Sequence, residues 1–237
     1  MKRREILAVI PARGGSKRLP HKNIKPLLGK PLIYWTISSA IESKCFSKVM
    51  VSTDCRKISD VSKEFGAEVP YIRNNELASD TATSVDVVID VIEYYKQQGV
   101  FFDYVMLLQP TSPLRRVTDI SRAIDMLNDS YDDKSVVSMC KCEHSPLWSA
   151  KISKSGKLET FIGEGSVGKR SQDLETYYRV NGAIYLISTQ VIFKERSFFI
   201  KDKTYSYIME NEYSIDIDEE IDFKIAEMMM NFRYENK

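Results

Sequence analysis

Short apolar segments alternate with segments of helical spacing along the first part of the chain, and this order constrains the fold more than any other feature. The apolar segments predict strands at residues 6–10, 68–72, 104–108 and 135–139, and residues 48–54 predict a strand followed by a turn. The segments of helical spacing predict helices at residues 31–41, 60–65, 83–98 and 118–129. Such an order builds an α/β, Rossmann-like, mostly parallel sheet with helices on both faces. Ligands of these sheets bind beyond the carboxyl ends of the strands.

The alternation is interrupted once. Residues 143–180 are rich in Ser, Gly, Lys and Glu and contain only short strand-like pieces. We interpret them as an excursion from the sheet that forms a small dimerisation lobe. A strand at 182–187 and a final helix at 219–233 are expected to follow. The length of 237 residues and the apolar content of 43% suit one domain, residues 1–237, with a sizeable core.

The composition disfavours several protein classes. The chain has 34 Lys and Arg against 33 Asp and Glu, so bulk electrostatics argue against a nucleic-acid partner. No apolar run reaches the length of a membrane span, and the one after the basic N-terminus is too short for a signal peptide. Four cysteines without a C-x-x-C pair predict core thiols in a cytoplasmic protein. The motifs of dinucleotide-binding folds, P-loop NTPases and α/β-hydrolases do not occur.

A basic, glycine-containing segment follows the first apolar run, at residues 11–23. Gly14 and Gly15 allow a tight turn and a close approach of the backbone to a ligand. The cations within the next few positions are Arg13, Lys17, Arg18 and Lys22. Backbone N–H groups, Lys and Arg together suit a polyphosphate. The alternative is a solvated basic loop.

An acidic segment lies near the other end of the chain, at residues 214–218. If this segment is extended, Asp216 and Asp218 point to the same side. Two carboxylates on one side suit a hard divalent cation such as Mg²⁺. The alternative is a helix N-terminus, where acidic residues are also favoured. We expect the basic and acidic segments to face each other across a site that holds a metal and an anion.

Two further polar segments adjoin predicted strands. The loop at 109–115 has its path fixed by two prolines, and its candidate donors are Gln109, Thr111, Ser112 and Arg115. The alternative is a purely structural loop. In the segment 179–182, Arg179 suits a carboxylate and Asn181 suits hydroxyls, although Asn-Gly is often only a turn.

With these residues in hand, the chain resembles the acylneuraminate cytidylyltransferases, also called CMP-sialic acid synthetases. The resemblance covers nearly the whole chain and rests on five segments in order: Pro11–Asn23, Arg73 with Glu76–Ser84, Gln109–Arg115, Arg179–Tyr185 and Ser214–Asp218. It implies transfer of a cytidylyl group, in which the anomeric hydroxyl of an acidic nine-carbon sugar attacks the α-phosphorus of CTP and pyrophosphate leaves.

The resemblance also implies the roles of individual residues. Cytidine would be held by the backbone around Ala12 and by Asn23, Arg73, Ala82 and Ser84. The triphosphate would be held by Arg13, Ser16, Lys17 and Lys22. The sugar would face Gln109, Arg179, Asn181 and Tyr185. Asp216 and Asp218 would carry Mg²⁺ or Mn²⁺. Members are usually homodimers, in which Phe198 and Phe199 would reach the sugar pocket of the partner subunit.

Two positions bear on the sugar. The family often has an arginine directly before the Gln of an R-Q-x-L stretch, but here Ser171 takes that place and Arg170 lies one residue earlier. Either Arg170 replaces it at the sugar carboxylate, or Arg179 acts alone. Related Kdo cytidylyltransferases typically carry a tyrosine where this chain has Gly14, which favours a nine-carbon sugar. Alternatives that stay open are legionaminic or pseudaminic acid as the sugar, a non-catalytic nucleotide-binding regulator, and a glycosyltransferase.

Overall fold

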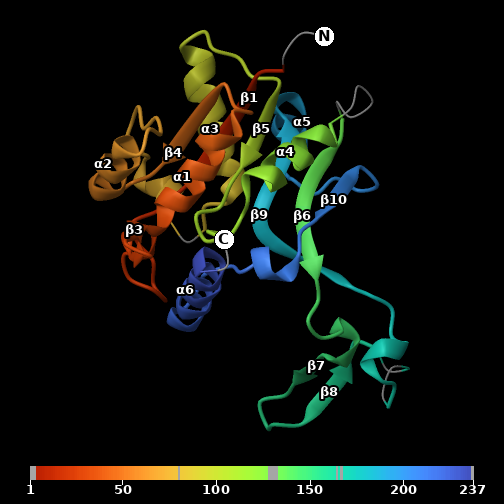
Figure 1. Cartoon of the computed structure of the whole chain (residues 1–237). Helices are drawn as coiled ribbons and strands as arrows, with labels where there is room; N and C mark the ends of the chain where they lie inside the picture. Colours follow the sequence, from red (N-terminus) through yellow and green to blue (C-terminus); the bar gives the residue numbers. More distant parts are fainter. Residues whose placement is uncertain (1–3, 80, 128–132, 164, 166–167, 236–237) are drawn as a thin grey trace.

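The computed structural model describes residues 4–79, 81–127, 133–163, 165 and 168–235. A six-stranded sheet forms its centre, in the order β10-β6-β9-β5-β1-β4 (Figure 1). Its strands are β1 (Ile6–Pro11), β4 (Lys48–Ser52), β5 (Tyr104–Leu107), β6 (Ser135–Lys141), β9 (Tyr178–Ser188) and β10 (Thr204–Ile208). β1 runs parallel to β4 and β5, and β10 runs parallel to β6, whereas β9 is antiparallel to both neighbours. The prediction of a mostly parallel sheet is confirmed.

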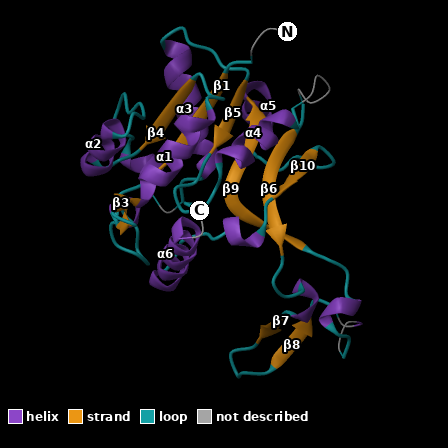
Figure 2. Cartoon of the chain, in the orientation of Figure 1, coloured by secondary structure: helices purple, strands orange, loops and turns teal. Residues whose placement is uncertain are grey.

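Helices cover both faces of this sheet, as Figure 2 shows. They are α1 (Leu32–Ser43), α2 (Arg56–Glu64), α3 (Ser84–Gln97), α4 (Val117–Asp125), α5 (Thr189–Glu195) and α6 (Glu220–Glu235). Alternate residues of β1 point to opposite sides: Ala8 and Ile10 pack in the cluster that contains α1 and α4, and Leu7 and Val9 in the cluster that contains α3 and α5. A third cluster joins α6 to α1 and the short β2–β3 hairpin (Pro26–Leu27 and Lys30–Pro31).

The structure differs from the predicted elements at several places. The strand expected at 68–72 is reduced to one bridge between Met50 and Glu68, because Pro70 has no N–H to continue a ladder along β4. The helix expected at 60–65 begins earlier, at Arg56, and ends before Gly66 as predicted. Strand β10 and helix α5 were not expected. The last two residues of the helix expected at 118–129 lie outside the described residues.

A small arm leaves the sheet between β6 and β9. It contains strands β7 (Ala150–Ile152) and β8 (Leu158–Phe161), which pair with each other and with no strand of the central sheet among the described residues. Figure 1 shows the arm projecting from the end of the sheet at which β6 finishes and β9 begins. Within the described part of the chain, no helix combines the length and apolar character needed to cross a bilayer.

Buried Asp119 ties α4 to the edge strand β10. Its carboxylate accepts the N–H of Arg116 (2.8 Å), which precedes the helix, and the hydroxyl of Tyr207 (2.9 Å) in β10. It also pairs with the Arg116 guanidinium at 2.9 Å. The side chain of Asp119 has no exposure to solvent, so these partners cannot be replaced readily by water.

We expect Asp119→Ala to lower the free energy of unfolding by about 2–3 kcal/mol, because a helix cap is lost and a buried hydroxyl loses its acceptor. Urea denaturation followed by circular dichroism measures this change. The control is Asp125→Ala on the exposed side of the same helix, which should change stability by less than about 0.5 kcal/mol. Equal effects of the two substitutions would contradict the role given to Asp119.

Candidate active site

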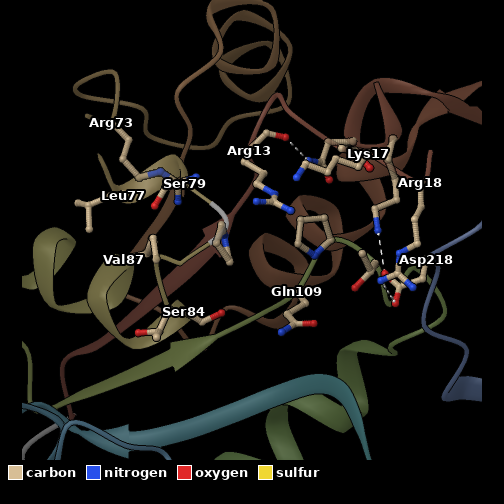
Figure 3. Close-up of a pocket in the computed structure, with 18 residues that line it drawn as sticks. Arg13, Lys17, Arg18, Arg73, Leu77, Ser79, Ser84, Val87, Gln109 and Asp218 are labelled. Atoms are coloured by element: carbon tan, nitrogen blue, oxygen red, sulfur yellow. Dashed lines mark hydrogen bonds and ion pairs between the residues drawn. The ribbon is translucent and has the colours of Figure 1, made fainter. Parts of the chain in front are cut away.

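A pocket of about 470 Å³ lies at the edge of the sheet where β1 and β5 end (Figure 3). The loop after β1, the loop after β5, the segment 73–87 and the acidic segment near α6 contribute to its wall. The predicted residues that line it are Arg13, Ser16, Lys17, Lys22, Asn23, Arg73, Ala82, Ser84, Gln109 and Asp218. Residues from four of the five sequence segments thus share one pocket. This is the position expected for a ligand of a parallel sheet.

The basic loop is held tightly against the end of β4. The Gly14 N–H donates to Asp54 Oδ1 at 2.8 Å, and the Asn23 side-chain amide donates to the Arg13 carbonyl at 3.0 Å. A β-carbon added at Gly14 would stand 2.9 Å from Cys55 Cβ, closer than real side chains approach. Gly14 is therefore required for this path of the chain. The predicted side chains of Arg13 and Lys17 face the pocket from this loop (Figure 3).

The two ends of the chain meet at this loop, as the charge pattern predicts. Lys22 Nζ donates to the Ile217 carbonyl at 2.6 Å and lies 3.3 Å from Asp218 Oδ1. Arg18 pairs with the other oxygen of Asp218 at 2.9 Å, and Lys25 pairs with Glu220 at the start of α6. The acidic segment is also tied to the loop after β5, because the Ile217 N–H donates to the Thr111 carbonyl at 2.8 Å.

Asp216 lies behind the pocket wall, not in it. Burial raises the pKa of its carboxyl, the negative charge of Asp218 raises this pKa further, and Thr111 and Lys22 lower it. Its Oδ1 atom is buried and finds no hydrogen-bond partner among the described residues. Within the same residues, no group of three or more His, Cys, Asp and Glu is arranged to hold a metal.

Gly182 brings Asp216 close to Gln109. Its φ of +77° is in the region that favours glycine. A β-carbon at this position would stand 3.0 Å from Gln109 Oε1 and 3.3 Å from Asp216 Oδ2. The glycine of the Asn-Gly pair is thus required both by its conformation and by the approach of two polar side chains from other segments.

The opposite wall of the pocket is formed by Arg73 and the start of α3. Arg73 is buried, its N–H donates to the Thr53 carbonyl at 2.8 Å, and its guanidinium lies 4.0 Å from Asp54. Burial lowers the pKa of Arg73, and the charge of Asp54 raises it. Helix α3 begins with a capping box in which Thr83 and Asp86 bond each other's backbone N–H groups. The N-terminal end of α3 faces the pocket through Thr83, Ser84 and Val87.

The other predicted residues lie outside the pocket lining, as follows: Ala12, Arg170, Arg179, Asn181, Tyr185, Phe198, Phe199 and Asp216. Ala12 is buried, and its N–H donates to the Ser52 carbonyl at 2.9 Å. Arg179 pairs with Glu143 at 2.7 Å near the base of the arm, and Arg170 is exposed on the arm. The ring of Tyr185 packs against those of Phe198 and Phe199 of the same chain, at centroid distances of 5.3 and 6.3 Å.

Asn181 is part of the core. Its carboxamide accepts the Ser138 hydroxyl at 2.6 Å and donates to the Ser214 hydroxyl at 2.9 Å. Because Ser214 begins the acidic segment, this bond fixes the segment that carries Asp216. The structure therefore gives Asn181 a supporting position, whereas the sequence analysis expected a sugar contact.

Some residues of the site were missed from the sequence. Asp54 was not singled out, although it accepts the Gly14 N–H and lies beside Arg73. Its place directly after the apolar segment 48–52 was the available signal. Val87 lines the pocket from the first turn of α3, where an apolar residue gives no sign of a site.

The chain is similar to known proteins along nearly its whole length. A sequence model described as "Cytidylyltransferase" matches residues 7–236. The chain is 41% identical to CMP-N,N'-diacetyllegionaminic acid synthase of Legionella pneumophila, over 97% of this chain and 98% of that protein. It is 32% identical to pseudaminic acid cytidylyltransferase of Campylobacter jejuni, over 97% and 98% of the two chains. It is 39% identical to N-acylneuraminate cytidylyltransferase of Streptococcus agalactiae, over 92% of this chain but only 51% of that protein.

The same fold occurs in a solved structure of CMP:2-keto-3-deoxy-manno-octonic acid synthetase complexed with CTP. The TM-score is 0.72 at 17% identity, and the match covers 97% of this chain and 99% of that one. The similarity therefore extends over the whole sheet and its helices. Taken with the sequence matches along nearly its full length, it shows that this chain belongs to the cytidylyltransferase family.

Proposed function

We propose that this protein activates an N-acylneuraminate-type nonulosonic acid with CTP, giving the CMP-sugar and pyrophosphate. The observation that carries this proposal is the meeting of the basic loop and the acidic segment at a pocket walled by Arg73 and the N-terminal end of α3. The relatives' printed names include legionaminic, pseudaminic and N-acylneuraminic acid enzymes. The alternative sugars are therefore legionaminic and pseudaminic acid. A cytoplasmic location stays a prediction.

The reaction needs little covalent chemistry from the protein. The anomeric hydroxyl oxygen bonds to the α-phosphorus, the bond to the β-phosphate oxygen breaks, and the hydroxyl proton is released. Positioning and charge neutralisation then supply most of the acceleration. We assign neutralisation of the leaving pyrophosphate to Arg13, Lys17 and Lys22, with Ser16 as a further donor. Ala12, Asn23, Arg73, Ala82 and Ser84 form the cytidine side.

Asp216 and Asp218 suit a divalent cation. The buried Oδ1 atom of Asp216 has an unfilled acceptor capacity among the described residues, and the two carboxylates are near enough to influence each other. Hard oxygen donors are the ligands that Mg²⁺ and Mn²⁺ prefer. We assign a metal to this pair; when bound, it screens phosphate charge and lowers the pKa of a hydroxyl. The Asp218 carboxylate also keeps the acidic segment against Lys22 and Arg18.

The sugar side is assigned to Gln109, Tyr185, Phe198 and Phe199, with Arg179 or Arg170 as the cation for the sugar carboxylate. Gln109 lines the pocket, and Tyr185 with the two phenylalanines forms an aromatic surface beside Asp216. Asn181 supports this side through Ser214. Gly14 admits no larger residue at its position, because an added β-carbon would meet Cys55; the preference for a nine-carbon sugar over Kdo rests on the sequence resemblance alone.

Release of pyrophosphate from CTP tests the function directly. We expect release with at least one of N-acetylneuraminic, legionaminic and pseudaminic acid, and a kcat/KM at least about tenfold lower with Kdo, a difference of about 1.4 kcal/mol. UTP in place of CTP is the control for the base. CTP binding without release for any of the sugars would support the non-catalytic regulator, and a preference for Kdo would overturn the nine-carbon assignment.

We expect Asp216→Asn to lower kcat by at least about a hundredfold, since one removed electrostatic group typically costs this much, and to change the KM for CTP by less than about threefold. Steady-state kinetics at saturating Mg²⁺ separates the two effects. Glu219→Gln removes an exposed acid of the same segment and should leave both constants nearly unchanged. A near-normal turnover of Asp216→Asn would remove this residue from the site.

We propose that the arm joins two subunits in a homodimer. It exposes Ile152, Leu158 and Ile162, each by more than 60%, and large apolar side chains gathered on a projecting element mark interaction surfaces. Its base carries Arg179, which we have assigned to the sugar side. A dimer through the arm would place the partner subunit close to that side.

Light scattering after gel filtration should give a mass twice the 27.3 kDa of the chain. The double substitution Ile152→Lys with Leu158→Lys should give 27.3 kDa, because two buried charges are costly at an apolar contact. Lys154→Ala, on the same arm, should keep the dimer. A wild-type monomer, or a double variant that stays dimeric, would refute this assignment.

A further inference from the structure

Arg115 is a buried cation whose role the proposed reaction does not explain. It follows the loop after β5 and is only 3% exposed. Its Nη1 atom donates to the Ala183 carbonyl at 2.9 Å and to the Gln109 carbonyl at 3.2 Å. Its Nε and Nη2 atoms are buried and find no hydrogen-bond partner in the described part of the chain. The hydrogen bonds of the guanidinium thus go to two backbone carbonyls.

Both carbonyls belong to the sugar side of the pocket. Gln109 lines the pocket, and Ala183 follows Gly182, where an added β-carbon would stand 3.0 Å from Gln109 Oε1 and 3.3 Å from Asp216 Oδ2. A shift of either carbonyl would change the distance between Gln109 and Asp216. One guanidinium therefore fixes the relative position of a loop and a strand that are far apart in the sequence.

The strand needs this support because its ladders are interrupted here. Pairing of β9 with β5 ends at Tyr185, and its pairing with β6 is irregular between Tyr185 and Val180. Side chains bond the backbone in this gap: the Ser138 hydroxyl accepts the N–H of Ile184, and the Asn181 side chain accepts the N–H of Ala183. Arg115 completes the set at the Ala183 carbonyl.

Stability does not account for a cation at this position. Burying a guanidinium is costly unless it is paired, and Asp119, whose negative charge raises the pKa of Arg115, is bonded to Arg116 and Tyr207. Burial lowers the pKa of Arg115 to about 9, because removal from water disfavours the charged form. A neutral residue of similar length would remove this cost.

We propose that Arg115 is a positioning residue for the sugar substrate. It holds Gln109 and the Gly182–Ala183 turn in a fixed position relative to Asp216. This inference rests on the proposed function. It predicts that the KM for CTP is independent of Arg115, because the hydrogen bonds of its guanidinium among the described residues go to the Gln109 and Ala183 carbonyls, not to the basic loop or Arg73. The step that depends on Arg115 is the presentation of the sugar to the α-phosphorus.

The test is Arg115→Met, which keeps the length and removes the charge and both bonds. We expect its Tm to equal or exceed that of the wild type, the KM for CTP to stay within twofold, and kcat/KM for the sugar to fall at least tenfold. Arg115→Lys, which keeps the charge but places its donors on one nitrogen in place of the planar fork, should recover part of this loss. Hydrogen exchange should be faster than in the wild type in peptides containing Gln109 and Ala183, and unchanged in the basic loop.

Arg116→Met is the matched control, and the opposite pattern is expected for it. Its guanidinium bonds Asp119 and stacks on Tyr213 outside the pocket, so its loss should lower Tm and leave kcat/KM for the sugar within twofold.

The inference is overturned if Arg115→Met keeps normal sugar kinetics, if it loses CTP affinity equally, or if its exchange is unchanged at Gln109 and Ala183. Failure of the wild type to release pyrophosphate with any sugar would instead refute the proposed function, and the exchange measurement would still decide whether Arg115 positions these segments.

Discussion

The structure depends on an electrostatic contact between the two ends of the chain. Lys22 and Arg18, from the loop after the first strand, hold Asp218, from the segment before the last helix. The contact is half-exposed, so its net contribution to stability is small. Its importance is geometric: it sets charges of opposite sign at the mouth of one pocket. A triphosphate entering this pocket meets cations that already have a carboxylate partner, so binding exchanges one ionic partner for another.

Buried polar groups fix the position of the acidic segment relative to the sheet. Ser138, Asn181 and Ser214 form a continuous hydrogen-bonded chain between the central sheet and the acidic segment. Such groups are costly unless they are fully bonded, and these are. Because each has fixed partners, the acidic segment can take only one position relative to β9. The charged residues facing the pocket thus rest on a neutral, rigid network, which limits reorganisation when charge develops during the reaction.

The features that could be predicted from the sequence are those that a local pattern of residues determines. The apolar segment before Pro11 and the polar residues after it identified both a strand and its site loop, because parallel strands place their following loops at one edge. Residues such as Lys22 and Asp218 were found from charge and spacing alone. The buried positions of Asn181 and Arg115 could not be predicted, because they depend on an irregular ladder between strands distant in the sequence. The strand expected at 68–72 failed at Pro70, where one bridge to the edge strand is all that forms.

The reversed direction of β9 has a structural consequence. Because β9 is antiparallel to β5 and β6, it begins at the edge where β5 and β6 end. The arm between β6 and β9 therefore leaves from and returns to the end of the sheet at which β6 finishes and β9 begins (Figure 1). The loops after β1 and β5, which line the pocket, leave the sheet at the same edge. The arm's length and composition can diverge among relatives without altering a single pairing within the sheet. The fold thereby separates the loops that line the pocket from an arm that adds no strand to the central sheet.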